Sequence, residues 1–195
     1  MMRDAEIKRK TMETDVLLKL ALDGGKVSVD TGVGFLDHML TLFAVHGRFG
    51  LEVACKGDTF VDDHHSVEDI GIALGAAFRE ALGDRSGIYR YGNFILPMDE
   101  ALIMSAVDFS GRAFLAFDAE MPAQKVGSFD TELVEEFWMG FVRNAECTLH
   151  IKKLAGTNTH HIIEGIFKSA AVTIRQAVAV DPSLEGGIPS SKGVL

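Results

Sequence analysis

The chain contains 195 residues, a length typical of one domain or of two small halves that share a core. Hydrophobic residues make up 47% and charged residues 24%, a balance that excludes a disordered or fibrous protein. The 28 acidic residues outnumber the 19 Lys and Arg and give a formal charge of −9. Binding to nucleic acid or to an anionic membrane is therefore disfavoured, because both rely on clustered cations.

The chain begins with charged residues 1–14, which lack the apolar core of a signal peptide. No later apolar run approaches the ~18 residues that a membrane span needs. Cys55 and Cys147 form no CxxC pair and are too few for a disulfide framework, which fits a reducing compartment. These features predict a soluble, cytoplasmic protein.

The first half of the chain predicts two strands, a helix, a third strand and a second helix. The turn signal Asp23-Gly24-Gly25 separates the first two strands. The first helix has one apolar face and ends at Gly47, a residue type common just past helix ends. The expected ranges are strands at 15–22 and 26–31, a helix at 35–46, a strand at 51–56 and a helix at 66–82.

The second half predicts the same succession of elements. Ser110-Gly111 is the turn signal between the first two strands, and Thr131 is a suitable N-cap for the first helix. The expected ranges are strands at 101–109 and 112–118, a helix at 131–146, a strand at 148–154 and a helix at 161–179.

Histidine placement also indicates a duplication. His64-His65 and His160-His161 are each followed three residues later by a glutamate, and the two HHxxE motifs lie 96 residues apart. At that offset, the apolar stretch 35–45 falls on residues 131–141. We interpret the chain as one domain of two internal repeats, near residues 1–90 and 91–182, followed by a tail at 183–195.

This division predicts an α+β fold. Each pseudo-symmetric repeat is expected to form a small mixed β-sheet with two helices packed on one face. The helices of the two halves are then expected to form a central layer.

Each HHxxE motif has the spacing of metal ligands. Positions i and i+4 share a helix face, so His64 and Glu68 can converge on one point, whereas His65 is rotated by about 100°. The same geometry holds for His160 with Glu164. Alternatively, Ser66 and Asp69 could form a capping box that leaves His64 and His65 in the preceding loop.

Two further histidines, His38 and His150, complete a set of six His and two Glu, which divides into two sites of three His and one Glu. Such donors suit Mn, Fe or Zn and leave a six-coordinate ion two open positions, which indicates catalysis. Taken alone, His38 or His150 would be interpreted as a packed residue. The same reading applies to His46, which suits the cation-favouring end of a helix.

Other polar residues have weaker signals. Lys168, one turn beyond Glu164, is a candidate anion contact in this acidic chain. Glu13 and Glu100 would ordinarily be surface acids, and Arg90 and Arg112 solvated cations. By composition the tail at 186–193 is a frayed end, although its serines, lysine and glycines could also wrap a phosphate.

Together these residues closely resemble the imidazoleglycerol-phosphate dehydratase family of histidine biosynthesis, in its monofunctional form. The similarity spans almost the whole chain, in order. The matching segments are RKTMETDV (9–16), TGVGFLDHML (31–40), DDHHSVEDIGIALG (62–75), PMDEAL (97–102), SGR (110–112), DTELVEEF (130–137), TLHI (148–151), NTHHIIEGIFK (158–168) and GGIPSSKGVL (186–195).

The resemblance implies a lyase that converts imidazoleglycerol phosphate to imidazole-acetol phosphate. It implies two Mn²⁺ per subunit that bind the substrate imidazole, and a 24-subunit shell with active sites between subunits. The implied metal ligands are His38, His64, His65, Glu68, His150, His160, His161 and Glu164. Substrate contacts would come from these ligands, other than His150, and from Glu13, His46, Arg90, Arg112, Lys168, Ser190, Ser191 and Lys192.

Six of these residues are expected to take part in catalysis, namely Glu13, His38, His65, Glu68, His161 and Glu164. Glu13 is the candidate for proton transfer, because a carboxylate near a dication can shuttle protons. Two rival functions share the metal site: a di-metal phosphate-ester hydrolase and a non-catalytic metal-binding shell protein. A nucleic-acid module is the weakest alternative, since the chain has no aromatic and basic surface pattern.

Overall fold

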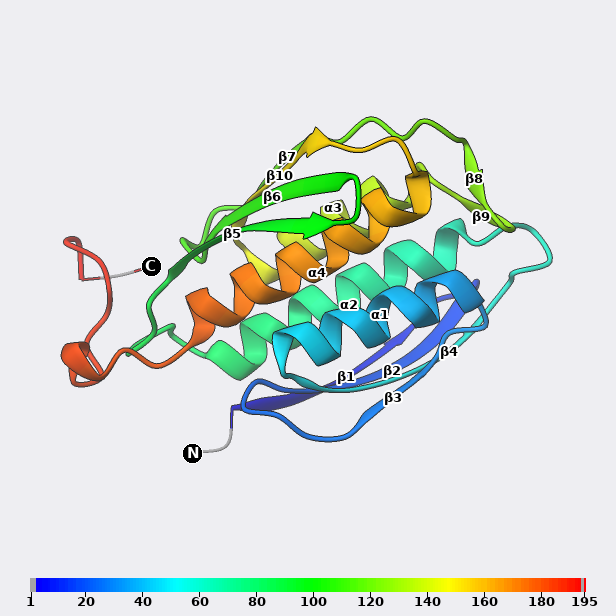
Figure 1. Cartoon of the computed structure of the whole chain (residues 1–195). Coiled ribbons are helices and arrows are strands. Elements are labelled where there is room, and N and C mark those ends of the chain that lie inside the picture. Colours follow the sequence, from blue (N-terminus) through cyan, green and yellow to red (C-terminus); the bar gives the residue numbers. More distant parts are fainter. Residues whose placement is uncertain (1–2, 194) are drawn as a thin grey trace.

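Two four-stranded sheets enclose a central layer of four helices in the computed structural model, which describes residues 3–193 and 195 (Figure 1). The first sheet contains β1 (Asp4–Lys10), β2 (Thr14–Ala21), β3 (Val27–Asp30) and β4 (Gly50–Gly57). The second contains β5 (Tyr91–Met98), β6 (Ala101–Asp108), β7 (Phe114–Asp118) and β10 (Thr148–Ala155). The remaining elements are α1 (Gly34–Gly47), α2 (His64–Leu82), the hairpin β8 (Lys125–Val126) and β9 (Phe129–Asp130), α3 (Leu133–Ala145), α4 (Thr159–Val178) and a short 3₁₀ helix at Pro182–Leu184.

Both sheets have the same topology. The strand orders are β1-β2-β4-β3 and β5-β6-β10-β7, and in each sheet the last-named strand is parallel to its neighbour while the other pairs are antiparallel. The predicted α+β fold of two pseudo-symmetric halves with a central helix layer is therefore confirmed.

Two features of the sheets differ from the sequence expectation, the order of the strands and the presence of two additional strands. The turn signals do not join neighbouring strands, because β4 lies between β2 and β3 and β10 lies between β6 and β7. Strands β1 and β5 were not expected. They are edge strands with few buried side chains, so their apolar alternation is weak.

The two repeats are not related by one constant offset. The first three strands of each half begin 87 residues apart, as Thr14 and Ala101 do, whereas the HHxxE motifs lie 96 residues apart. The difference arises because the β8–β9 hairpin is inserted only in the second half, between β7 and α3. The predicted boundary at residue 90 falls directly before β5.

The helix ends depart from the predicted caps. Helix α1 continues through Gly47, and Arg48 takes the left-handed conformation with φ 58°. Gly47 is needed for a different reason, since a Cβ there would lie 2.3 Å from the Phe49 ring. Thr131 does not cap α3, because its hydroxyl donates to the Ala123 carbonyl at 2.9 Å.

Helices α2 and α4 each begin two residues earlier than predicted, at His64 and Thr159. All four histidines of the HHxxE motifs therefore lie in helices, and the capping-box alternative is wrong. Asn158 caps α4, with its side-chain oxygen accepting from the backbone N–H of His160 at 2.9 Å. Among the described residues, no helix has the length and apolar character required to cross a membrane.

The helices of the two halves pack against each other, α1 on α4 and α2 on α3. The backbones of α2 and α3 approach closely at glycines. A Cβ added to Gly71 would lie 2.4 Å from the Phe137 carbonyl oxygen, and one added to Gly75 would lie 2.3 Å from that of Phe141. Large side chains such as Trp138 and Phe78 are fully buried around this contact.

This contact reverses the usual effect of replacing a helical glycine. Gly→Ala inside a helix normally stabilises by about 1 kcal/mol. Gly75→Ala should instead lower the free energy of unfolding by about 1–3 kcal/mol, because the two helices must move apart. Urea unfolding of this variant, with Gly34→Ala as control, measures the effect. A Cβ on Gly34 would meet no atom within 4 Å, and equal stability of the two variants would contradict the prediction.

Candidate metal centre and active site

Three predicted ligands from two helices converge on one point. His38 in α1 and Glu164 in α4 are in contact, with Nε2 and Oε1 2.9 Å apart. His160 lies one turn before Glu164, and its Nε2 is 4.0 Å from the same oxygen. The three candidate ligand atoms all lie within 4.8 Å of one another. Packing of α1 on α4 brings His38 to the i, i+4 pair that the sequence predicted.

The electrostatics of this cluster suit a divalent cation. The Glu164 side chain is only 8% exposed, and burial raises its pKa. Hydrogen bonds from Lys168 and His38 outweigh that cost and hold the pKa below its ordinary value, so the group is a carboxylate at neutral pH. Two imidazoles and a carboxylate are ligands for Mn, Fe or Zn, and their donor chemistry therefore fits the predicted metal.

The second histidine of each motif points elsewhere. The rings of His160 and His161 are nearly perpendicular, at 86°, and those of His64 and His65 are at 82°. His161 Nδ1 lies 2.7 Å from Glu100 Oε2 in the turn between β5 and β6. His65 Nδ1 lies 3.1 Å from Asp58, just after β4. The two histidines of each motif therefore point in different directions, as the rotation of about 100° per helical residue predicted.

These hydrogen bonds shift the pKa values of both histidines and of Glu100. The hydrogen bond from His161, followed by that from the Asn158 backbone, lowers the pKa of Glu100 to about 2. In return, the Glu100 hydrogen bond raises the pKa of His161, and the Asp58 hydrogen bond raises that of His65. The sequence interpretation missed both carboxylates. The 87-residue offset between Glu13 and Glu100, equal to that between the strands, is the signal that could have indicated Glu100.

The remaining predicted ligands are distributed over the chain as follows. The N-terminal ends of α1, α2 and α4 lie at the same end of the molecule, so His64, His65 and Glu68 share that end with the cluster (Figure 1). Helix α3, the counterpart of α1, contains no histidine. His150 lies on the outward face of β10, where its ring is 5.9 Å from that of Phe114, and does not join the cluster within one chain.

Glu13 lies close to His65. The backbone carbonyl of Glu13 accepts from the Asp58 N–H at 3.1 Å, which ties the turn after β1 to the end of β4. The Glu13 side chain is half exposed, and its Oε1 is 3.8 Å from His65 Nε2. Its carboxylate therefore faces the ring nitrogen that Asp58 does not occupy.

Two of the predicted anion contacts, Arg90 and Arg112, lie beside Asp108, a residue that the sequence interpretation did not single out. The third, Lys168, is instead paired with Glu164 in the histidine cluster, at 3.1 Å. The Arg90 guanidinium donates to both Asp108 oxygens, at 2.7 and 3.1 Å, and to the Pro189 carbonyl at 2.9 Å. Arg112 is exposed, with a nitrogen 3.9 Å from Asp108. Arg90 thereby holds the tail just before Ser190, Ser191 and Lys192.

The histidine cluster and the Arg90 region lie at opposite ends of helix α4. The backbone N–H of Arg90 donates to the Ala177 carbonyl at 2.8 Å, near the last turn of α4. His160 lies in the first turn, and 17 residues of helix at 1.5 Å per residue separate the two positions by about 25 Å. His46 is also toward the Arg90 end, because its carbonyl accepts from Arg175. One chain therefore cannot bring the histidine cluster and the tail to the same small molecule.

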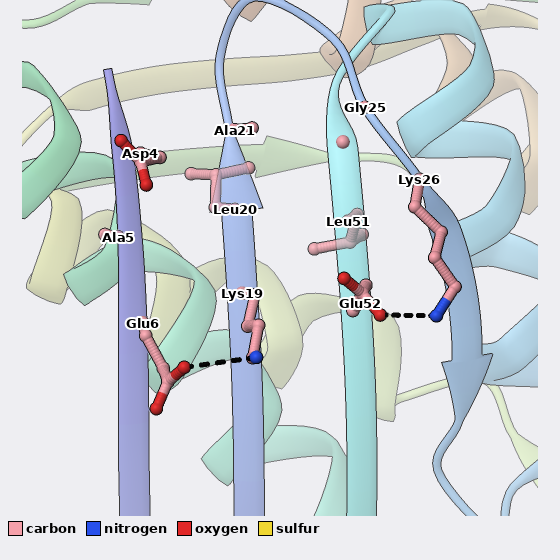
Figure 2. A pocket seen from close by; sticks show the side chains of 11 residues that line it. Asp4, Ala5, Glu6, Lys19, Leu20, Ala21, Gly25, Lys26, Leu51 and Glu52 are labelled. Carbon is pink, nitrogen blue, oxygen red and sulfur yellow. Dashed lines mark hydrogen bonds and ion pairs between the residues drawn. The ribbon is translucent and has the colours of Figure 1, made fainter. Parts of the chain in front are cut away.

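The hollow in Figure 2, of about 340 Å³, is not part of this site. It lies over the open face of the first sheet, where Lys19 pairs with Glu6 at 3.3 Å and Lys26 with Glu52 at 2.7 Å. None of the predicted ligands lines it. Four of the five charged side chains that line it are paired with one another.

Comparison with known proteins identifies close relatives over nearly the full chain. A family model described as imidazoleglycerol-phosphate dehydratase matches residues 31–174. Curated imidazoleglycerol-phosphate dehydratases from Prochlorococcus marinus (strain NATL1A) and Desulforamulus reducens are each 57% identical over 194 residues, which cover 99% of this chain and 96% and 98% of those proteins.

Two solved structures have the same fold. Imidazoleglycerol-phosphate dehydratase from Staphylococcus aureus matches with a TM-score of 0.84 and 42% identity, covering 91% of this chain and 99% of that one. The Pyrococcus furiosus enzyme, in complex with (S)-C348, matches with a TM-score of 0.85 and 36% identity, covering 97% and 100%.

Proposed function

Since the chain belongs to the imidazoleglycerol-phosphate dehydratase family, and is therefore a hydro-lyase, we propose that it dehydrates imidazoleglycerol phosphate to imidazole-acetol phosphate with two Mn²⁺ per subunit. The observation that carries the metal part of this proposal is the cluster of His38, His160 and Glu164. Its ionised, buried carboxylate and two half-exposed imidazoles form three of the four ligands that the motif count predicts for one ion.

The fourth ligand of this ion, and the second site, are proposed to involve neighbouring subunits. His65 is available at the cluster end of the molecule, and His150 on an outward sheet face. The distance of about 25 Å between the cluster and the Arg90 region supports an active site shared between copies. We propose the 24-subunit shell that the resemblance implies, because a closed assembly would bring opposite ends of different chains together.

The bound ions would act as Lewis acids and as a template for the substrate imidazole. The reaction removes a hydroxyl from the carbon next to the ring and a proton from the adjacent carbon, and the resulting enol tautomerises to the ketone. Lys168 keeps Glu164 ionised and oriented by donating to its Oε2 at 3.1 Å. Glu13, half exposed and 3.8 Å from His65 Nε2, would move the proton.

The phosphate end of the substrate would be held by a different copy. Arg90, aligned by both oxygens of Asp108, keeps the tail in place, and the exposed Arg112 is free to meet an anion. Ser190, Ser191 and Lys192 add hydroxyl, amide and ammonium donors. Together these cations would form a local anion-binding site, although the chain as a whole has a net charge of −9.

The test is turnover of imidazoleglycerol phosphate by the assembled protein after chelation and again after Mn²⁺ is restored. Ketone should form only with metal, and free phosphate measured in parallel should stay at background. Phosphate release would instead identify a hydrolase. If two ions were bound per chain but no ketone formed, the protein would be a non-catalytic metal-binding protein.

A further inference from the structure

We propose that Glu100 and Asp58 are positioning residues that hold the rings of His161 and His65 so that the Nε2 atom of each is presented to a metal ion. The inference rests on the proposed function, because it assumes that these histidines bind metal. It assigns a purpose to two carboxylates that neither the motifs nor the resemblance singled out.

Glu100 is held in a defined orientation by three donors from α4 and the residues before it. Its Oε1 accepts from the backbone N–H groups of Asn158, at 2.7 Å, and Thr157, at 3.2 Å. Its Oε2 lies 2.7 Å from His161 Nδ1. The carboxylate thus links the β5–β6 turn to the first turn of α4 and leaves one oxygen for the ring.

This contact selects the tautomer that a metal needs. An ionised carboxylate can only accept, so His161 must carry its proton on Nδ1, and the lone pair remains on Nε2. A hydrogen bond of this kind is a common second contact of metal-binding histidines and fixes both ring orientation and basicity.

In the first repeat, a carboxylate also contacts the Nδ1 atom of the histidine, but it comes from a different place in the fold. Asp58 contacts His65 Nδ1 at 3.1 Å directly after β4, whereas Gly156 follows β10 in the second repeat. Conversely, Glu13 occupies the position 87 residues before Glu100 but faces His65 Nε2. Because Asp58 takes over the positioning role in the first repeat, Glu13 is left facing the reactive side of the ring.

Asp99 provides a matched control from the same turn. Its carboxylate lies 3.8 Å from His161 Nε2, beyond hydrogen-bond distance, and its side chain is 74% exposed. Asp99→Asn and Glu100→Gln remove the same charge near the same ring. Only the second changes the contact with Nδ1, so their difference isolates the hydrogen bond.

The experiment measures Mn²⁺ affinity by chelator competition, together with the electron paramagnetic resonance spectrum of bound Mn²⁺, in the assembled protein. Glu100→Gln should weaken binding at one of the two sites by about 10–100-fold and change the spectrum, whereas Asp99→Asn should match the parent. The amide oxygen of Gln can still accept from the two backbone N–H groups, which would direct its NH₂ toward Nδ1 and favour the wrong tautomer. A role limited to holding the turn predicts that Glu100→Gln resembles the parent and that only Glu100→Ala is impaired.

Parent-like affinity and spectrum in Glu100→Gln, with the parent binding two ions, would overturn the positioning role and leave the proposed function intact. A parent protein that binds no Mn²⁺ would overturn the proposed function itself. Asp58→Asn repeats the test on His65 and should show the same loss. It decides the question if Glu100→Gln fails to assemble.

Discussion

Replacing Glu164 with glutamine is expected to abolish binding of the metal ion proposed between α1 and α4 and to lower turnover by about 10³-fold or more, since a catalytic metal contributes several kcal/mol to transition-state stabilisation. Glu164 is the only anionic member of the cluster and is almost fully buried. Glutamine keeps the size of the side chain and can still accept from Lys168, so the fold should persist while the charge that attracts the cation is lost.

Two measurements test this expectation, bound Mn²⁺ per subunit and the rise in melting temperature on adding Mn²⁺. A metal that binds only the native state raises that temperature, and the rise should be much smaller in Glu164→Gln than in the parent. Glu135→Gln, an exposed change on α3, is the matched control. A Glu164→Gln protein with two bound ions and parental turnover would show that the cluster is not the metal centre.

Replacing Glu13 with glutamine is expected to lower turnover by about 10²–10⁴-fold, the usual contribution of a proton-transferring side chain. Mn²⁺ content should not change, because Glu13 is not one of the predicted metal ligands and lies outside the cluster of Glu164. Substrate affinity should change little, since glutamine preserves shape and hydrogen-bonding capacity. Steady-state kcat and KM, with metal analysis of the same sample, measure all three quantities.

Glu6→Gln is a suitable comparison for Glu13→Gln, because Glu6 lies in β1, the strand before the turn that contains Glu13, and pairs with the exposed Lys8 at 3.0 Å. It should leave kcat at the parental value. Equal losses of affinity and turnover in Glu13→Gln would make Glu13 a binding residue. Loss of Mn²⁺ from that variant would make it a metal ligand instead.

The helices were predictable to within about two residues because their signals are local. An apolar face repeats every three to four residues, and the i, i+4 relation of His160 and Glu164 follows from helix geometry alone. Errors came at the ends, where neighbours in space decided the conformation. Gly47 is required by the Phe49 ring, and the Thr131 hydroxyl bonds to Ala123 instead of capping α3.

Strand order was not predictable from the turn signals. The chain turns after β2 and after β6, but pairing is decided by which later strand completes the sheet, and β4 and β10 take the central positions. Edge strand β1 was missed because only two of its seven residues, Ala5 and Ile7, are apolar.

By itself, the sequence determined the repeated HHxxE motifs and the family to which the chain belongs, because these depend on residue identity and on spacing within one helix. Only the tertiary structure decided which distant groups meet. His38 joins Glu164 across 126 residues, Glu100 meets His161 across 61, and the Arg90 region lies about 25 Å from the cluster. These relations depend on the packing of segments that are distant in sequence, between the two halves for His38 and within the second half for Glu100, which no local pattern encodes.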